Sequence, residues 1–246
     1  MKYNIIIPAR YGSKRYKGKP LVKILGREMI LRVADICSKV SGKKNLFIAT
    51  DDNRILSVVK KNGYNAIMTK KNCLTGTDRV AEAAMKLDSN IFINVQGDEP
   101  TINPKDIKKI INAKKKFPNH IICGYDKINR YENPSNRNIP KVVVNASNDL
   151  IYISRSVIPG SKNINKKIDY HKQVCIYAFS KKELKDYSSL NKKTFLEKVE
   201  DIEILRFFDL NHKIKMVKLN SNSVAVDEIS DVKKAEKILI KNEKKK

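Results

Sequence analysis

The chain has 246 residues, of which 41% are hydrophobic and 31% are charged, with a formal net charge of +25. No apolar run reaches the roughly 18 residues that a membrane-spanning helix needs, so the sequence excludes a transmembrane protein and predicts no membrane partner. This length and composition suit one large α/β domain, or one domain with a small lobe.

The positive charge has two explanations. Lys supplies 41 of the 51 basic residues and Asn occurs 24 times, and both have A-rich codons, so a compositional bias would enrich them together. The alternative is nucleic-acid binding, which usually combines a basic patch with aromatic stacking platforms. The basic residues are instead scattered in short runs, such as residues 114–116, without interleaved aromatics. We therefore expect no nucleic-acid partner, although weak steering of anionic substrates fits the charge.

The four cysteines, Cys37, Cys73, Cys123 and Cys175, show no C-x-x-C spacing and lie in or beside apolar segments. With only three histidines in the chain, this pattern favours reduced core or near-core thiols over disulfides or a zinc site. The first residues lead directly into a strand-like apolar run without a signal-peptide pattern. A cytoplasmic location is therefore the expectation.

Short apolar runs and segments of helical spacing alternate through the first half of the chain. Buried strands are predicted at residues 5–7, 46–49, 66–68, 91–95 and 121–124. Apolar residues spaced three and four apart predict helices around residues 29–37, 55–59, 80–87 and 107–111. This alternation favours an α/β fold with a mostly parallel sheet covered on both faces, a Rossmann-like three-layer sandwich.

The pattern changes after Pro140. Residues 141–145 and 150–153 predict a hairpin, and a polar loop spans residues 160–169. The later elements are predicted as a strand at 174–179, a helix at 197–210, a strand at 213–219 and a last helix from 231. Because no repeat and no Gly/Ser linker occurs, we expect a single domain over residues 1–246, in which residues 131–246 add a smaller antiparallel subdomain.

A basic loop follows the first predicted strand, at residues 8–21, and contains two Arg, three Lys, one Ser and two Gly. Ligands of open α/β sheets bind at the carboxyl ends of strands, and glycine-rich backbone and Arg side chains bind phosphate there. The loop matches neither the P-loop nor the dinucleotide-binding motif. We predict that it binds nucleotide phosphates through Ala9, Arg10, Ser13, Arg15 and Lys19.

This loop reads R-Y-x-S-x-R-x-x-G-K-P-L and resembles the signature of the 3-deoxy-manno-octulosonate (Kdo) cytidylyltransferase family of sugar nucleotidyltransferases. The resemblance covers essentially the whole chain, and further motifs follow in order: A-T-D-D at 49–52, T-G-T-D-R at 75–79, N-V-Q-G-D-E-P at 94–100, K-V-V at 141–143, Y-I-S-R at 152–155, I-Y at 176–177 and V-D at 226–227. Several motifs in the same order form a specific signal, whereas each alone is weak.

The resemblance implies a GT-A-like nucleotidyltransferase fold and a homodimer. It implies that CMP passes from CTP to the anomeric 2-hydroxyl of a 3-deoxy-2-keto sugar acid such as Kdo, with release of pyrophosphate. Residues 1–130 would then form the CTP-binding half, and residues 131–246 the sugar-binding and dimerisation part. The hairpin region at residues 140–159 is the predicted interface arm.

Two carboxylates are the candidate metal ligands. Asp98 follows a predicted strand and Asp227 ends an apolar stretch. Mg²⁺ is often held by one or two carboxylates together with substrate phosphates, and the resemblance implies that these two are the ligands. The alternative for each is a turn or helix cap. We predict that both converge on one ion opposite the basic loop, with a catalytic set of Arg10, Arg15, Lys19 and Asp98.

The T-G-T-D-R segment precedes a predicted helix, whose N-terminus favours anions. Thr75, Gly76 and Thr77 are therefore predicted to contact the nucleotide together with Gln96, unless the threonines only cap the helix. An acidic sugar also needs cations, for which Arg79 and Arg155 are candidates. The resemblance implies a sugar-acid site formed by Arg79, Gln96, Arg155, Gln173, Tyr177 and Glu203. Tyr177 also fits a core residue of a strand.

Two positions depart from the family pattern. Gln173 stands where the family has His, and Ile204 stands where it has Gln in a late helix. A site built to hydrogen-bond a hydroxyl discriminates strongly, and Ile cannot form that bond. The substrate can therefore be Kdo, a Kdo analogue or a nonulosonate-like acid. A basic nucleic-acid-binding homologue without catalysis is the remote alternative.

Overall fold

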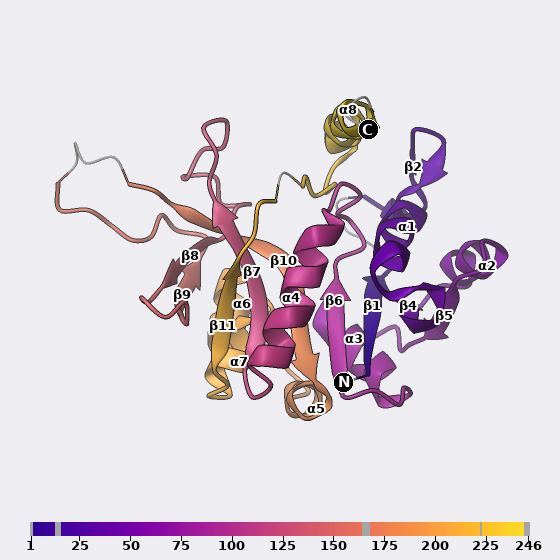
Figure 1. Ribbon diagram of the computed structural model, residues 1–246, viewed down its shortest axis with the longest axis horizontal. Helices are drawn as coiled ribbons and strands as arrows, with labels where there is room; N and C mark the ends of the chain where they lie inside the picture. The colour runs from indigo at the N-terminus through magenta and orange to yellow at the C-terminus, as the bar shows by residue number, and fades with distance from the viewer. Residues whose placement is uncertain (1, 13–15, 164–167, 222, 244–246) are drawn as a thin grey trace.

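The computed structural model describes residues 2–12, 16–163, 168–221 and 223–243 (Figure 1). Seven strands of its central sheet follow the order β11-β7-β10-β6-β1-β4-β5. Their bounds are β1 Tyr3–Ala9, β4 Leu46–Thr50, β5 Asn65–Met68, β6 Ile91–Val95, β7 Ile121–Lys127, β10 His171–Ser180 and β11 Ile214–Lys218. Neighbours in this order pair in parallel except at β10, which is antiparallel to both β6 and β7. The predicted, mostly parallel sheet is confirmed.

Helices cover both faces of this sheet, as Figure 1 shows. One apolar cluster contains side chains of α1 (Met29–Ser41), α2 (Asn53–Lys61) and α4 (Pro104–Lys116). The opposite cluster contains side chains of α3 (Gly76–Met85), α5 (Lys181–Ser189) and α7 (Leu205–Asp209). The three-layer prediction is therefore confirmed, although α5 was not predicted. No helix in the described ranges is both long and apolar enough to cross a membrane.

The continuous apolar run of β1 has a simple cause. Side chains alternate between the two faces of a strand. Ile5 and Ile7 enter the cluster beneath α1 and α4, whereas Ile6 enters the opposite cluster. All three are fully buried, because helices cover both faces.

Smaller elements extend the sheet and cover its edge. The predicted hairpin is confirmed as β8 (Lys141–Val144) and β9 (Leu150–Ser154), and β8 also pairs with β10. Figure 1 shows this hairpin far from β4 and β5. The C-terminal helix α8 (Ile229–Glu243) has a buried alanine that packs in a small cluster with Ile24, Met29 and Val226.

Four further short elements were not predicted. β2 (Lys23–Ile24) and β3 (Arg27–Glu28) form a separate two-stranded sheet. Single 3₁₀ turns lie at Lys19–Leu21 and Lys43–Asn45. Whether residues 1–130 and 131–246 act as functional halves stays a prediction.

The single helix predicted at residues 197–210 is wrong. The segment forms α6 (Phe195–Glu200) and α7 (Leu205–Asp209), separated at Asp201, whose φ of 48° and ψ of 49° are left-handed. Ile202 and Ile204 are both buried. Residues two apart lie on opposite sides of a continuous helix, so the break allows both side chains to turn inward.

Candidate active site

A cavity of about 600 Å³ opens at the carboxyl ends of β1 and β6. The location agrees with the rule that ligands of open α/β sheets bind at this edge. The predicted nucleotide contacts that line it are Ala9, Arg10, Lys19, Thr75, Gly76, Gln96 and Asp98. The later part of the chain contributes Lys193, Asp201, Glu203 and Asp227. The predicted contacts Ser13 and Arg15 lie outside the described residues.

Lys19 joins the two candidate metal ligands. Its Nζ lies 2.8 Å from Asp98 Oδ2 and 3.2 Å from Asp227 Oδ1. Burial alone lowers the pKa of Lys19, but the charges and hydrogen bonds of the two carboxylates outweigh burial and raise this pKa. The predicted convergence of Asp98 and Asp227 is confirmed, whereas their role as metal ligands stays a prediction.

Capping bonds near the two carboxylates are accepted by neighbouring residues. The amides of Asp227 and Glu228 donate to Asp231 Oδ2, so Asp231 is the residue that closes the start of α8. At the start of α4, Asn103 accepts the capping bond from the amide of Lys105. Both candidate ligands line the cavity, and Asp98 also lies in a turn, so the turn-or-cap alternative is not contradicted.

The donor set fits Mg²⁺. Two carboxylates around one ammonium carry a net negative charge, and carboxylate and phosphate oxygens are the ligands that Mg²⁺ prefers. The described ranges contain no group of three or more His, Cys, Asp and Glu arranged for a metal. A metal at Asp98 and Asp227 would therefore need further oxygens from phosphates or water.

Gly97 allows two strands to come close together beside this site. A Cβ at position 97 would lie 2.9 Å from the carbonyl oxygen of Pro8 and 3.1 Å from Ile30 Cδ1. A side chain here would force the loops after β1 and β6 apart. The absence of a side chain at Gly97 thus lets the backbone of Pro8 approach closely.

The N-terminus of α3 is covered by the carboxylate of Glu203. One oxygen accepts from the amide of Gly76 at 3.0 Å, and the other accepts from the amide and hydroxyl of Thr77 at 2.8 and 2.6 Å. Burial raises the pKa of Glu203, and the bonds from Thr77 and Gly76 partly oppose that rise. Thr75 is the N-cap, as the structural alternative predicted, and accepts from the amide of Asp78.

A family model described as cytidylyltransferase matches residues 4–215. The chain belongs to the cytidylyltransferase family. An Escherichia coli protein named 3-deoxy-manno-octulosonate cytidylyltransferase is 37% identical, over 91% of this chain and 90% of the relative. A Shewanella baltica protein named 8-amino-3,8-dideoxy-manno-octulosonate cytidylyltransferase is 34% identical, over 97% of this chain and 99% of the relative.

The fold agrees with this membership. The solved structure of CMP:2-keto-3-deoxy-manno-octonic acid synthetase, complexed with CTP, superposes with a TM-score of 0.91 at 35% identity. The match covers 98% of this chain and 100% of that one. The resemblance stated from the sequence motifs and the nucleotidyltransferase fold are both confirmed.

Arg79 lines the cavity of this cytidylyltransferase, but its guanidinium is bound by protein groups. Nη2 donates to Asp51 Oδ2 at 3.0 Å, and Nη1 donates to Thr69 Oγ1 and to the carbonyl of Lys70. The side chain is 3% exposed. In this structure Arg79 therefore holds the segments after β4 and β5 together.

Arg155 does not line the cavity. Nε and Nη2 donate to the carbonyls of Glu200 and Asp201, and Nη1 donates to the carbonyl of Arg137. This arrangement satisfies carbonyls at the C-terminal end of α6, where cations are favoured. All three guanidinium nitrogens of Arg155 are used within the protein.

Gln173, Tyr177 and Ile204 also do not line the cavity. Gln173 Nε2 donates to the hydroxyl of Tyr177 at 3.1 Å. Tyr177 is 4% exposed in the apolar cluster beneath α3, and burial raises the pKa of its phenol well above the usual value. Ile204 is 1% exposed in the same cluster, which agrees with its being apolar. A sugar contact by Gln173 or Tyr177 stays a prediction.

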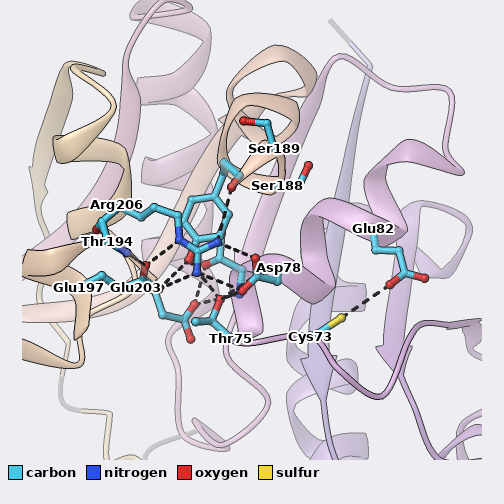
Figure 2. Close-up of polar contacts among 12 residues, drawn as sticks. Cys73, Thr75, Asp78, Glu82, Ser188, Ser189, Thr194, Glu197, Glu203 and Arg206 are labelled. Atoms are coloured by element: carbon cyan, nitrogen blue, oxygen red, sulfur yellow. Dashed lines mark hydrogen bonds and ion pairs between the residues drawn. The ribbon is translucent and has the colours of Figure 1, made fainter. Parts of the chain in front are cut away.

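The fully buried guanidinium of Arg206 lies beside the start of α3 (Figure 2). Arg206 donates to both carboxylate oxygens of Glu197, at 2.6 and 2.8 Å, and to Asp78 Oδ1 at 2.7 Å. Asp78 in turn accepts from the hydroxyl of Thr75 at 2.7 Å. This chain of contacts connects α6 and α7 to the N-cap residue at the cavity wall.

Sequence reasoning missed Lys193 and Asp201. Lys193 Nζ lies 2.7 Å from Asp201 Oδ1, and both residues line the cavity. Lys193 lies in a polar loop, and Asp201 was assigned to the interior of a predicted helix. No motif marks either residue, and their place at the site follows only from the break at Asp201 and its ion pair with Lys193.

Proposed function

We propose that this protein transfers CMP from CTP to the anomeric 2-hydroxyl of Kdo and releases pyrophosphate. The observation that carries the proposal is the convergence of Asp98 and Asp227 on Lys19 in a cavity at the carboxyl ends of β1 and β6. The names of the E. coli relative and of the CTP-bound structure support both substrates.

The side chains of the cavity have complementary roles in this proposal. Arg10 is exposed at the cavity and forms no hydrogen bond or ion pair with another described residue, so its guanidinium can bind phosphate oxygens. Lys19 places a positive charge where charge develops on the leaving pyrophosphate. Asp98 and Asp227 would hold Mg²⁺, which when bound neutralises phosphate charge and favours ionisation of the attacking hydroxyl. The cavity orients the two substrates for in-line attack, and no covalent enzyme intermediate is needed.

The identity of the sugar acid needs a direct comparison. The S. baltica relative has almost the same identity to this chain as the E. coli one, and its name specifies an 8-amino sugar acid. Gln173 and Ile204 also depart from the pattern of the Kdo family. The 8-amino analogue of Kdo is therefore the second candidate substrate.

The test is a pyrophosphate-release assay with CTP and UTP, each paired with Kdo, 8-amino-Kdo and a nonulosonate. We expect turnover with CTP and Kdo, and at least a tenfold preference for CTP over UTP. A larger kcat/KM with 8-amino-Kdo would favour the second candidate. No pyrophosphate release with any sugar acid would contradict the proposed function.

Three further properties belong to the same proposal: dependence on Mg²⁺, a homodimeric assembly and a cytoplasmic location. The β8–β9 hairpin lies in the predicted interface region and exposes the side chain of Ile151, which is compatible with a dimer contact there. Light scattering after size-exclusion chromatography would measure the assembly. Filter binding to DNA at moderate salt would test the remote nucleic-acid alternative, for which we expect no retention.

A further inference from the structure

An acidic sugar needs a cation for its carboxylate, and three of the predicted substrate-binding cations are already bound by protein groups. Arg79 is paired with Asp51, and Lys19 is shared by two carboxylates. Arg155 donates from each of its three guanidinium nitrogens to backbone carbonyls and does not line the cavity. To bind a substrate carboxylate, each of these side chains would first have to break several hydrogen bonds or a buried ion pair within the protein.

Lys193 differs from these three residues. It lines the cavity, its side chain is 29% exposed, and its one hydrogen-bond partner in the described ranges is the carboxylate of Asp201. The side chain of Asp201 is 72% exposed, so water can replace it without leaving a buried charge. An exposed ion pair of this kind exchanges partners at low cost.

Asp201 also indicates that the surrounding charge favours a carboxylate. The hydrogen bond from Lys193 is the main cause that lowers the pKa of Asp201, and the positive charges of Arg155 and Arg10 act in the same direction. The left-handed turn at Asp201 places its carboxylate at the wall of the cavity. A protein carboxylate therefore contacts Lys193 directly and is also stabilised by the positive charges of Arg155 and Arg10.

We propose that Lys193 binds the carboxylate of the sugar acid, and that Asp201 is its partner until the substrate carboxylate replaces it. This inference rests on the proposed function and specifies which residue recognises the acid. Arg10 remains available for the triphosphate. Lys193 and Asp201 would then have opposite effects on affinity, because one attracts the substrate carboxylate and the other competes with it.

The test measures KM for both substrates in variants of this pair. We expect Lys193→Ala to raise the KM for the sugar acid by about tenfold or more, as expected for loss of a charged hydrogen bond, with little change in the KM for CTP. Lys193→Arg should restore most of the affinity. Asp201→Asn should lower the KM for the sugar acid, because the competing charge is gone.

The matched control is Lys192→Ala, which removes one positive charge from the neighbouring exposed position outside the cavity lining. It should leave both KM values near wild type. If Lys193→Ala raises the KM for CTP and not the KM for the sugar acid, the assignment is overturned. It is also overturned if Lys193→Ala and Asp201→Asn raise the KM for the sugar acid equally, because loss of a purely structural ion pair has the same effect from either side. Failure of the wild-type protein to turn over any sugar acid would overturn the proposed function itself.

Discussion

The backbone N–H of Val226 donates a hydrogen bond of 2.8 Å to the carbonyl oxygen of Asp98. This contact joins the loop after β6 to the segment before α8, and it brings Asp227 to the same ammonium group that Asp98 contacts. The two carboxylates come from distant parts of the chain, so their meeting depends on the completed fold.

Replacing either carboxylate by its amide should remove most activity. In Asp98→Asn or Asp227→Asn, a neutral oxygen replaces a charged ligand, and we expect kcat to fall on the order of 100-fold or more. The concentration of Mg²⁺ that gives half-maximal rate should also rise. The matched control is Asp88→Asn, whose carboxylate is fully exposed beside Lys2 and far from the cavity lining. Activity within twofold of wild type in Asp98→Asn would exclude the metal role.

Arg206 should be important for stability. Arg206→Met would leave the carboxylates of Glu197 and Asp78 without their shared cation, and Glu197 is fully buried. Breaking one side of a buried pair typically costs about 3–5 kcal/mol of unfolding free energy. Urea denaturation measures this change.

The control for Arg206 is Lys234→Met, which breaks an exposed pair with Asp231. Exposed pairs contribute about 0–1 kcal/mol, so this variant should unfold close to the wild type. If both variants lose the same unfolding free energy, the buried contacts of Arg206 contribute no more to stability than the exposed pair of Lys234.

Cys73 should react slowly with alkylating reagents at neutral pH. Burial raises the pKa of its thiol to about 11, and Glu82, which accepts from the thiol at 3.6 Å, adds to the rise while Arg79 opposes it (Figure 2). The rate of iodoacetamide labelling should increase about tenfold per pH unit between pH 7 and pH 9.5, without a plateau. Mass spectrometry of the labelled peptide measures this rate, with Cys73→Ser as the unlabelled control.

Bound CTP should slow this labelling, because Cys73 lines the cavity. A plateau near pH 8 would mean that the thiol has an ordinary pKa. If CTP does not change the labelling rate, Cys73 does not lie at the nucleotide site.

Glu203 should make stability depend on pH. Its pKa in the folded protein is raised above 4.5 by burial, so the folded state holds the proton more tightly than the unfolded state. The resulting contribution of Glu203 to the unfolding free energy is fully present below pH 4.5. It is lost as the pH rises through the folded-state pKa. Glu203→Gln lacks this titration.

The unfolding free energy of wild type minus that of Glu203→Gln should therefore decrease between pH 4 and pH 7. Urea denaturation at several pH values in this window measures the difference. An increase with pH would mean that the bonds from Gly76 and Thr77 outweigh burial and lower the pKa. A constant difference would mean that the pKa of Glu203 is unchanged by folding.

Local patterns predicted much of the fold. Each side chain of the run at residues 5–7 is apolar, and a strand whose two faces are both buried requires that composition. The motifs at Asp98 and Asp227 likewise indicated two carboxylates that meet, and the structure confirms the meeting. The order of strands was not predictable in this way, because the antiparallel insertion of β10 between β6 and β7 depends on pairing between distant segments.

Hydrophobic periodicity and contiguous motifs are local properties of the chain, so they were enough to predict the class of fold, the element order of the first half and the family. Which charged groups remain available at the site depends on contacts between distant segments. Arg79 and Arg155 are bound by protein partners, Glu203 covers the start of α3, and Asp201 meets Lys193 at the cavity at a break that helical periodicity did not predict. A residue type specifies what a side chain can bind, but the packed segments around it determine which of its partners are already present.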